Sequence, residues 1–277
     1  MRRALITAFV LAVSALPASP ALATTQTAGA GPVTATFTFS GHYPNYSGLR
    51  LRISQSGSVL YDHPVRSKTC GKYCAPGATG PRASSVHILD LAGTGQPNVV
   101  LDLYSGGAHC CSIEQVFTFD PATMTYAATE RNFGDPGARI EDLSHDGHKE
   151  FVTADDSFAY AFTDFAASGL PLQILTFSGG RFHDVTAAYP GLVRTDAADW
   201  LRTFTHMARQ HYADSVGVIA AWAADEYRLG RSAAANRFLA AQARAGHLKS
   251  ALGRSEPQGQ RFVAALKAFL RRHGYTP

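Results

Sequence analysis

The spacing of apolar residues changes at Pro190, and this change divides the 277-residue chain into two halves of different structure. Before Pro190, apolar and polar residues alternate in short runs such as Thr34–Phe39, and turn-forming residues such as Ser178–Gly180 separate the runs. After Pro190, apolar residues recur every three to four positions, which is typical of amphipathic helices. We therefore predict an α+β protein. A mostly antiparallel β module over 33–190, built of propeller-like blades or a sandwich, precedes a helical module over 191–277.

Four helices are expected in the second half, each bounded by capping residues. The first spans Asp196–His211, and Asp214 is positioned to cap a second helix that ends at Gly230. Ser232 and Pro257 open the third and fourth helices. Because the connections are short, neighbouring helices should be antiparallel, and we expect a small bundle or a pair of helical hairpins.

The first 23 residues have the three parts of an export signal. A pair of arginines supplies positive charge, an apolar run follows over Ala4–Leu16, and the small-x-small sequence before Thr24 suits cleavage. No later apolar stretch reaches the ~20 residues of a transmembrane helix. We therefore expect a secreted, extracellular protein without a transmembrane segment. Its small and polar segment over 24–32 is expected to be flexible.

Four cysteines in an exported chain indicate two disulfides. They fall as Cys70 with Cys74 and as the adjacent pair Cys110 and Cys111. Because a bond between adjacent cysteines closes a strained ring, we favour two bridges that run between the clusters. The alternative is a metal site made by Cys110, Cys111 and His109, but this spacing matches no common zinc pattern.

Charge is distributed unequally between the two halves. Residues 24–190 carry 10 Lys/Arg against 15 Asp/Glu, whereas residues 191–277 carry 13 against 6, a net charge of +7. We favour the interpretation that the basic helices pack on acidic partners in their own chain, because their charges are interleaved with apolar residues. The alternative is a surface for an anionic cell-surface polymer or protein. Nucleic acid is not expected as a partner, since the chain is exported and no recognition motif occurs.

One self-similar pair of segments occurs in the β half. Ile88–Val100 and Ile140–Val152 are offset by 52 residues and share an Ile, an Asp, a Leu and a Gly at matching positions. An apolar strand follows in both copies. A period near 50 residues is in the range of a β-propeller blade, so the repeat indicates two copies of one structural unit.

The second copy has the ligand spacing of a calcium-binding loop. The six positions, from first to ninth, are filled by Asp142, Ser144, Asp146, Gly147, the His148 carbonyl and Glu150. Three converging carboxylates repel one another unless a cation lies between them, so the sequence predicts one calcium site here. The alternative is a solvated turn, because Ser144 replaces the usual carboxylate or amide. The first copy keeps only Asp90, Thr94 and Asn98 and is expected to survive as a turn.

The Asp-Leu-x-x-Asp-Gly-x-x-Glu motif of the second copy, followed by an apolar strand, resembles the FG-GAP and VCBS repeats of integrin-type β-propellers. The Gly106–Cys111 sequence is similar to one in exported bacterial proteins that carry such repeats. The resemblance covers 86–186 and implies a calcium-stabilised β module used as a scaffold or for surface interaction. It implies as calcium ligands Asp142, Ser144, Asp146, His148 and Glu150. Two detectable units are fewer than the 4–8 blades that close a ring, so a partial propeller or a sandwich is the alternative.

The sequence contains no nucleophile elbow, zinc-binding helix motif, phosphate-binding loop or dinucleotide fingerprint. Asp102 could form a pair of catalytic carboxylates with Asp155 or Asp156, but their spacing does not favour catalysis over solvated strand ends. We therefore expect a secreted, non-catalytic scaffold or binding protein. The alternatives are a secreted hydrolase that holds a metal in the acidic loop, and an anion-binding wall protein that acts through the basic helices.

Overall fold

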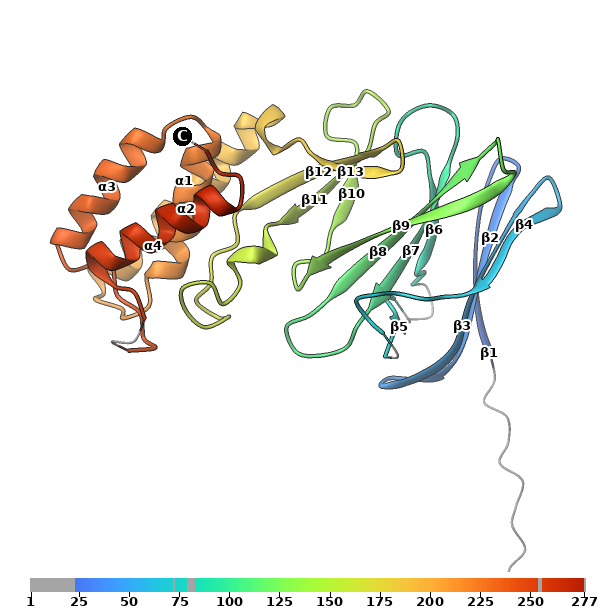
Figure 1. The fold of residues 1–277 in the computed structure, drawn as a ribbon, viewed down its shortest axis with the longest axis horizontal. Helices are drawn as coiled ribbons and strands as arrows, with labels where there is room; N and C mark the ends of the chain where they lie inside the picture. Colours follow the sequence, from blue (N-terminus) through green and yellow to red (C-terminus); the bar gives the residue numbers. More distant parts are fainter. Residues whose placement is uncertain (1–22, 72, 79–82, 254–255, 277) are drawn as a thin grey trace, which may run out of the picture.

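A computed structural model describes residues 23–71, 73–78, 83–253 and 256–276. The predicted α+β class is confirmed, because three antiparallel sheets form the first part of the chain and four helices the second (Figure 1). The described strands do not close into a barrel. The predicted export signal over 1–23 lies, up to residue 22, outside the described residues.

The first sheet is an antiparallel meander of β1 (Ala23–Ala30), β2 (Val33–His42), β3 (Asn45–Gln55) and β4 (Ser58–Pro64). The expectation of a flexible segment over 24–32 is wrong, because β1 pairs with β2 along its full length, from Ala23 opposite Ser40 to Ala30 opposite Val33. The side chains of β1 are small or polar and bury little apolar surface. Backbone hydrogen bonds therefore hold this edge strand, and hydrophobic alternation gives no sign of it.

The second and third sheets are built alike, and each begins with one copy of the sequence repeat. The second sheet contains β6 (Val86–Leu89), β7 (Asn98–Tyr104), β8 (Ser112–Asp120) and β9 (Thr125–Gly134), with the two-residue β5 (Ala75–Pro76) also paired to β7. The third contains β10 (Arg139–Glu141), β11 (Glu150–Ala154), β12 (Leu172–Ser178) and β13 (Arg181–Asp184). In both, the repeat supplies two neighbouring strands, β6 and β7 or β10 and β11, and the loop between them, so the sequence repeat is also a structural repeat.

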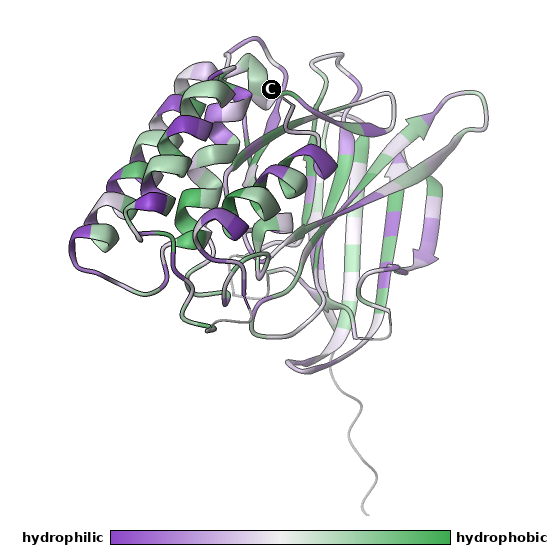
Figure 2. Ribbon diagram, turned by 60° about the vertical axis from the view of Figure 1, so that its left-hand side comes forward, coloured by the Kyte–Doolittle hydropathy of each residue, from purple (hydrophilic) through white to green (hydrophobic). Residues whose placement is uncertain are grey.

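Successive side chains along each strand point to opposite faces of the sheet, and both faces of the second sheet are buried. Figure 2 shows the hydrophobic and hydrophilic segments along the strands. On one face, Leu101 packs with Phe37 of the first sheet. On the other face, Val100 packs with Phe151 and Phe177 of the third sheet. A sheet that is covered on both sides must place any polar side chain between two protein layers.

The helical half consists of α1 (Pro190–Arg209), α2 (Val216–Arg228), α3 (Ser232–Arg244) and α4 (Gly259–Arg272). Of two short 3-10 helices, η1 (Asp156–Phe158) lies between β11 and β12 in the chain, and η2 (Thr186–Ala188) lies between β13 and α1. The central helix is α2, in which 11 of 13 residues are buried and which contacts each of the other three helices. None of the described helices is both long and apolar enough to cross a membrane.

α3 begins at Ser232 as predicted, but the starts of the other three helices differ from the prediction. α1 begins at Pro190, six residues before Asp196, because a proline is favourable in the first turn, where its missing N–H would have no helical partner. Asp214 does not cap α2 and instead accepts a hydrogen bond from the Thr163 hydroxyl. α4 begins at Gly259, two residues after Pro257.

Candidate functional site

The two repeat loops have the same hydrogen-bonding pattern. Asp90 accepts hydrogen bonds from the amides four and five residues later, Thr94 at 3.1 Å and Gly95 at 2.6 Å. Asp142 does the same with Asp146 at 3.2 Å and Gly147 at 3.1 Å. The last residue of each turn is a glycine with positive φ, +79° and +91° respectively, which suits residues without a Cβ. Each loop is therefore fixed by its own first aspartate.

The two loops also pair with each other. Ala92 and His148 form an antiparallel bridge, and the Lys149 amide donates to the Leu91 carbonyl at 3.0 Å. A Cβ added at Gly93 would lie 3.1 Å from the His148 ring, so the loops are in close contact. These backbone contacts join the second sheet to the third at one end.

The predicted calcium ligands lie in this second loop. Asp146 Oδ1 accepts from the His148 amide at 2.9 Å, and this hydrogen bond holds the pKa of Asp146 below its usual value. Glu150 is 2% exposed, and its Oε2 accepts from the Leu143 amide at 2.9 Å, while Ser144 is exposed. No group of three or more His, Cys, Asp or Glu side chains in the described ranges gathers where a metal ion would fit. The calcium site therefore stays a prediction.

A cleft of about 480 Å³ lies between the second and third sheets. Its walls include Asp102, Tyr104, Ser112 and Glu114 on the second sheet, and the segments 136–139 and 152–154 of the third. Asp102 and Glu114 are directly opposite each other on β7 and β8, so their side chains share the face that the third sheet covers. Asp102 was a candidate from the sequence, but its partner is Glu114 and not Asp155 or Asp156.

Glu114 is the most perturbed group in the cleft. Glu114 is 7% exposed, and its carboxyl group forms a side-chain hydrogen bond with that of Asp102. Burial, with the neighbouring Asp102 carboxylate, raises the pKa of Glu114 to about 10. Glu114 is therefore a neutral acid at pH 7, whereas the Asp102 carboxylate lies 3.0 Å from the Nε2 atom of His87. That hydrogen bond raises the pKa of His87, against the opposing effect of burial.

Asp155 and Asp156 follow β11 and have other roles. Asp155 accepts hydrogen bonds from the Tyr275 hydroxyl at 2.8 Å and from the Ser157 amide at 3.1 Å. Asp156 packs against Gly134, at a point where a Cβ would collide with its carboxylate. These residues therefore contribute to packing around η1 and do not line the cleft with Asp102.

The disulfide pairing differs from the expected one. Cys70 bonds to Cys74 and Cys110 bonds to its neighbour Cys111, so no bridge runs between the clusters. Within this loop the Tyr73 amide donates to the Cys70 carbonyl, and the Cα atoms of Cys70 and Cys74 are 4.8 Å apart, so a local partner is within bonding range. The alternative metal site is also wrong, because bonded cysteines have no thiolate to offer a metal.

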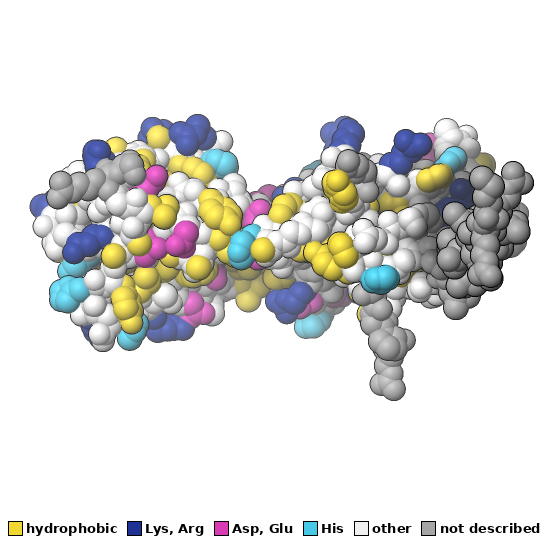
Figure 3. Space-filling view, turned by 90° about the horizontal axis from the view of Figure 1, so that it is seen from below, with side chains coloured by type: hydrophobic (Ala, Val, Ile, Leu, Met, Phe, Trp, Pro, Cys, Tyr) yellow, Lys and Arg dark blue, Asp and Glu magenta, His cyan; other side chains and the backbone are white. Residues whose placement is uncertain are grey.

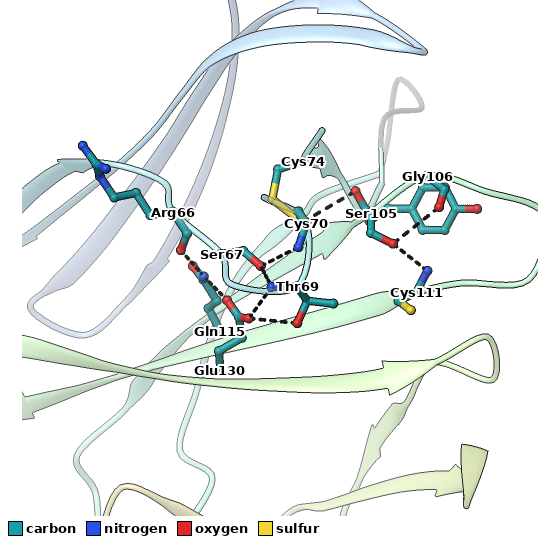
Figure 4. The surroundings of a disulfide bond; sticks show 11 residues. Arg66, Ser67, Thr69, Cys70, Cys74, Ser105, Gly106, Cys111, Gln115 and Glu130 are labelled. Carbon is teal, nitrogen blue, oxygen red and sulfur yellow. Dashed lines mark hydrogen bonds between the residues drawn. A yellow bond between two sulfur atoms is a disulfide. The ribbon is translucent and has the colours of Figure 1, made fainter. Parts of the chain in front are cut away.

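Hydrogen bonds attach the Cys70–Cys74 loop to the second sheet (Figure 4). Glu130 on β9 accepts from the amide and hydroxyl of Thr69, at 3.3 and 3.1 Å, and Gln115 on β8 donates to both Glu130 and the Arg66 carbonyl. Although burial works to raise it, these hydrogen bonds hold the pKa of Glu130 below its usual value. The loop is thus fixed by polar contacts rather than by a bridge to Cys111.

The connection between β7 and β8, which carries Cys110 and Cys111, reaches an aromatic cluster that the sequence does not reveal. His109 stacks on Phe165 with ring centroids 4.0 Å apart, and both contact Tyr160. Tyr160 is 59% exposed. Nothing in the local sequence pattern brings residues 109 and 165 together, because they meet only through the stacking of the second and third sheets.

One comparison with known proteins, a family match, falls in the helical half. A family described as the sll0997 C-terminal domain matches residues 193–274, which contain most of α1 and all of α2–α4. A probable thylakoid lumen protein of Synechocystis sp. is 30% identical over 137 residues, which are 48% of this chain and 40% of that protein. The uncharacterized protein y4bJ of Sinorhizobium fredii is 28% identical over 148 residues, 52% of this chain and 22% of the relative. The chain thus spans less than half the length of each, and no solved structure matches it.

Proposed function

We propose that this chain is an exported, non-catalytic binding protein in which two stacked β-repeat units present a polar cleft. The observation that carries the proposal is the pairing of the two repeat loops, which joins the sheets that wall the cleft. A cleft between two sheets that are linked by backbone contacts is preorganised, and preorganisation lowers the cost of binding. The export signal over 1–23 supports a location outside the cytoplasm, as does the name of the Synechocystis relative.

The same proposal assigns a structural calcium ion to the second loop. Asp142, Ser144, Asp146, Glu150 and the His148 carbonyl offer only oxygen atoms, the donors that calcium prefers. When bound, the ion would neutralise the carboxylates of the loop. The Asp142 and Asp146 carboxylates would have to exchange backbone amides for the ion. By this assignment the repeats resemble FG-GAP and VCBS repeats in function as well as in sequence.

Thermal unfolding of the exported chain, residues 24–277 with both disulfides intact, tests the calcium assignment. We expect calcium, but not magnesium, to raise the unfolding midpoint relative to chelator, since a ligand at a hundred times its Kd stabilises by about 2.7 kcal/mol. Asp142→Asn keeps the hydrogen-bond acceptor for the Gly147 amide but removes a charge, and it should abolish the shift. Asp90→Asn is the matched change in the first loop and should leave the shift intact. Equal losses from both variants, or no shift at all, would contradict the assignment.

The basic helical half supplies a second candidate interaction, with an anionic cell-surface polymer. Lys and Arg side chains are spread over the helical lobe on the left of Figure 3, and the Arg202 side chain is 72% exposed. Because exposed charges are screened by salt, retention on an anionic polymer should disappear at moderate ionic strength. Retention that persists in high salt, or none in low salt, would argue against this role.

A further inference from the structure

A groove runs between the segment 61–69 and the face of the second sheet that is turned to the first sheet. Two pockets, of about 570 and about 310 Å³, adjoin along it, and both volumes are in the range of small-molecule sites. The pockets share Arg66, Gln115 and Ala128, so they form one elongated hollow. No described residue lines both this groove and the cleft between the second and third sheets, so the groove is a separate site.

The floor of the groove is the face of the sheet rather than its hydrogen-bonding edge. Gln115 on β8 is directly opposite Glu130 on β9. Phe117 is opposite Ala128 in the same register, so the four side chains lie on one face. Gln115 donates to the Arg66 carbonyl at 2.7 Å and to Glu130 at 2.8 Å. These hydrogen bonds fix the wall above the floor, so the groove is formed before any ligand binds.

Two basic side chains at the groove have no acidic partner. Arg66 and Lys68 are exposed and line the larger pocket, and neither forms an ion pair with a described residue. Figure 4 shows the Arg66 side chain extending away from the carbonyl that Gln115 contacts. Among the described residues that line the two pockets, Glu130 alone is acidic, and its carboxylate already accepts hydrogen bonds from Thr69 and Gln115. The groove therefore carries excess positive charge, which is complementary to an anionic ligand.

We propose that this groove binds an acidic oligosaccharide, a chain of sugar rings that carries carboxylate groups. Arg66 and Lys68 suit the carboxylates, since charge-assisted hydrogen bonds are the strong ones. Thr69 and Asn132 line the larger pocket with hydroxyl and amide groups that suit sugar hydroxyls. Tyr61 lines the smaller pocket and supplies an aromatic ring with a polar tip. The inference goes beyond the proposed function, because it adds a site outside the cleft and does not depend on it.

The shape of the groove favours a sugar chain over an acidic peptide. An extended peptide gains affinity by adding a strand to a sheet edge, where backbone groups are free to pair. The floor of this groove is made of side chains on a sheet face, and the hydrogen-bonding groups that it presents are side-chain amides, hydroxyls and a carboxylate. Two pockets in line also suit a ligand of linked units better than a single small anion.

Calorimetric titration of the exported chain, residues 24–277, with trigalacturonic acid tests the inference. Its trimethyl ester is the neutral probe of equal length, and triglutamate is the acidic peptide probe. We expect the acid to bind at neutral pH and low ionic strength, and the other two probes to bind roughly tenfold more weakly or not at all. Removing both cations, in the double variant Arg66→Gln with Lys68→Gln, should weaken binding of the acid roughly tenfold.

Two further variants separate the groove from the rest of the surface. Ala128→Phe fills the floor of the groove without changing any charge, and it should abolish binding. Because Ala128 is exposed, the unfolding midpoint should not change. Arg52→Gln removes an exposed arginine of β3 that lines neither pocket, and it should bind the acid like the unsubstituted chain.

Unchanged affinity in the double variant or in Ala128→Phe would overturn the inference, because the acid would then bind elsewhere, for example at the basic helices. An equal loss in Arg52→Gln would show a response to net charge alone and would also contradict it. No binding of the acid, or equal binding of its ester or of triglutamate, would show that the ligand class is wrong. The calcium-dependent melt reports on the repeat loops separately, so the two proposals can fail independently.

Discussion

Asp225, on the central helix, is a buried carboxyl group that shares a hydrogen bond with a second carboxyl group. Its side chain is fully buried and forms a side-chain hydrogen bond with Asp196. Burial, reinforced by the nearby Asp196 carboxylate, raises the pKa of Asp225 to about 9. Because the pKa lies above neutral pH, Asp225 is present as the neutral acid, which can donate its hydrogen to the Asp196 carboxylate.

The buried acid makes stability depend on pH. Between the unfolded value of 3.8 and the folded value of about 9, only the native state holds the Asp225 proton, so the free energy of unfolding falls as pH rises. The slope from one group is at most about 1.4 kcal/mol per pH unit. Asp225→Asn should therefore flatten this dependence and should be more stable than the unsubstituted chain at pH 8, as measured by urea unfolding at pH 5, 6.5 and 8.

Glu114 accounts for the pH dependence of stability that should remain in Asp225→Asn, and the exposed Asp199 provides the control substitution. Glu114, with a pKa of about 10, contributes a slope of the same sign, so Asp225→Asn should reduce the pH dependence without removing it. Asp199 is about half exposed and pairs with Arg202, so Asp199→Asn should leave the slope unchanged. Identical slopes for Asp225→Asn and the unsubstituted chain would show that Asp225 does not hold a proton in the native state.

Neither Glu114 nor Asp225 can be picked out from the sequence, for a physical reason. Alternation in β8 suggests one buried face and one solvated face, but the second sheet is covered on both sides, so Glu114 and Gln115 are both buried. Asp225 lies in a helix that is buried nearly all round, where a polar residue predicts a solvated face. The burial of these residues depends on which sheets and helices pack against each other, and the sequence around each residue does not contain that information.

Elements whose pattern is local were predicted from the sequence. The hairpin of β12 and β13 lies where alternation and the Ser178–Gly180 turn signal place it, and four helices form as expected. The Asp142 turn was likewise visible, because its residues are close in sequence. What the sequence missed depends on contacts between distant segments. β1 exists only because β2 offers a partner, and the loops pair through Ala92 and His148.

The disulfide pairing also could not be predicted from the sequence, because it depends on how one loop is held in the folded chain. Spacing alone left several pairings open, and the choice between clusters rested on the cost of bonding adjacent residues. In the structure a turn over 67–71 and a hydrogen-bond network with Glu130 fix the Cys70 loop without help from Cys111. Once polar contacts hold a loop in place, a long-range bridge is not needed to position it.

At the scale of the whole molecule, the β and helical halves share an apolar core, in which Phe158 and Phe162 pack with the helices, and they also meet through the polar contacts of Arg228. Arg228, at the end of α2, donates to the Leu172 carbonyl at the start of β12, and its guanidinium lies 4.5 Å from the Tyr275 ring centroid. It also lies 3.4 Å from Asp184 on β13. Tyr275 in turn donates to Asp155, after β11, at 2.8 Å. One basic residue of the helical half is thus used inside the chain, as the interleaved charge pattern suggested.

These contacts predict that the two halves unfold together. The Arg228 side chain is only 12% exposed, so Arg228→Ala removes charge-assisted hydrogen bonds and leaves acceptors of the third sheet unpaired. We expect a destabilisation of roughly 1.5–3 kcal/mol and the separation of one calorimetric transition into two. The matched change Arg202→Ala removes an arginine whose side chain is 72% exposed, and a surface pair of this kind contributes at most about 1 kcal/mol.

Equal effects of the two substitutions, or two transitions already present in the unsubstituted chain, would mean that the Arg228 contact does not couple the halves. A single transition with the predicted loss in Arg228→Ala would instead place further coupling at Asp196, which accepts from the Leu172 amide at 2.9 Å and joins α1 to the same strand.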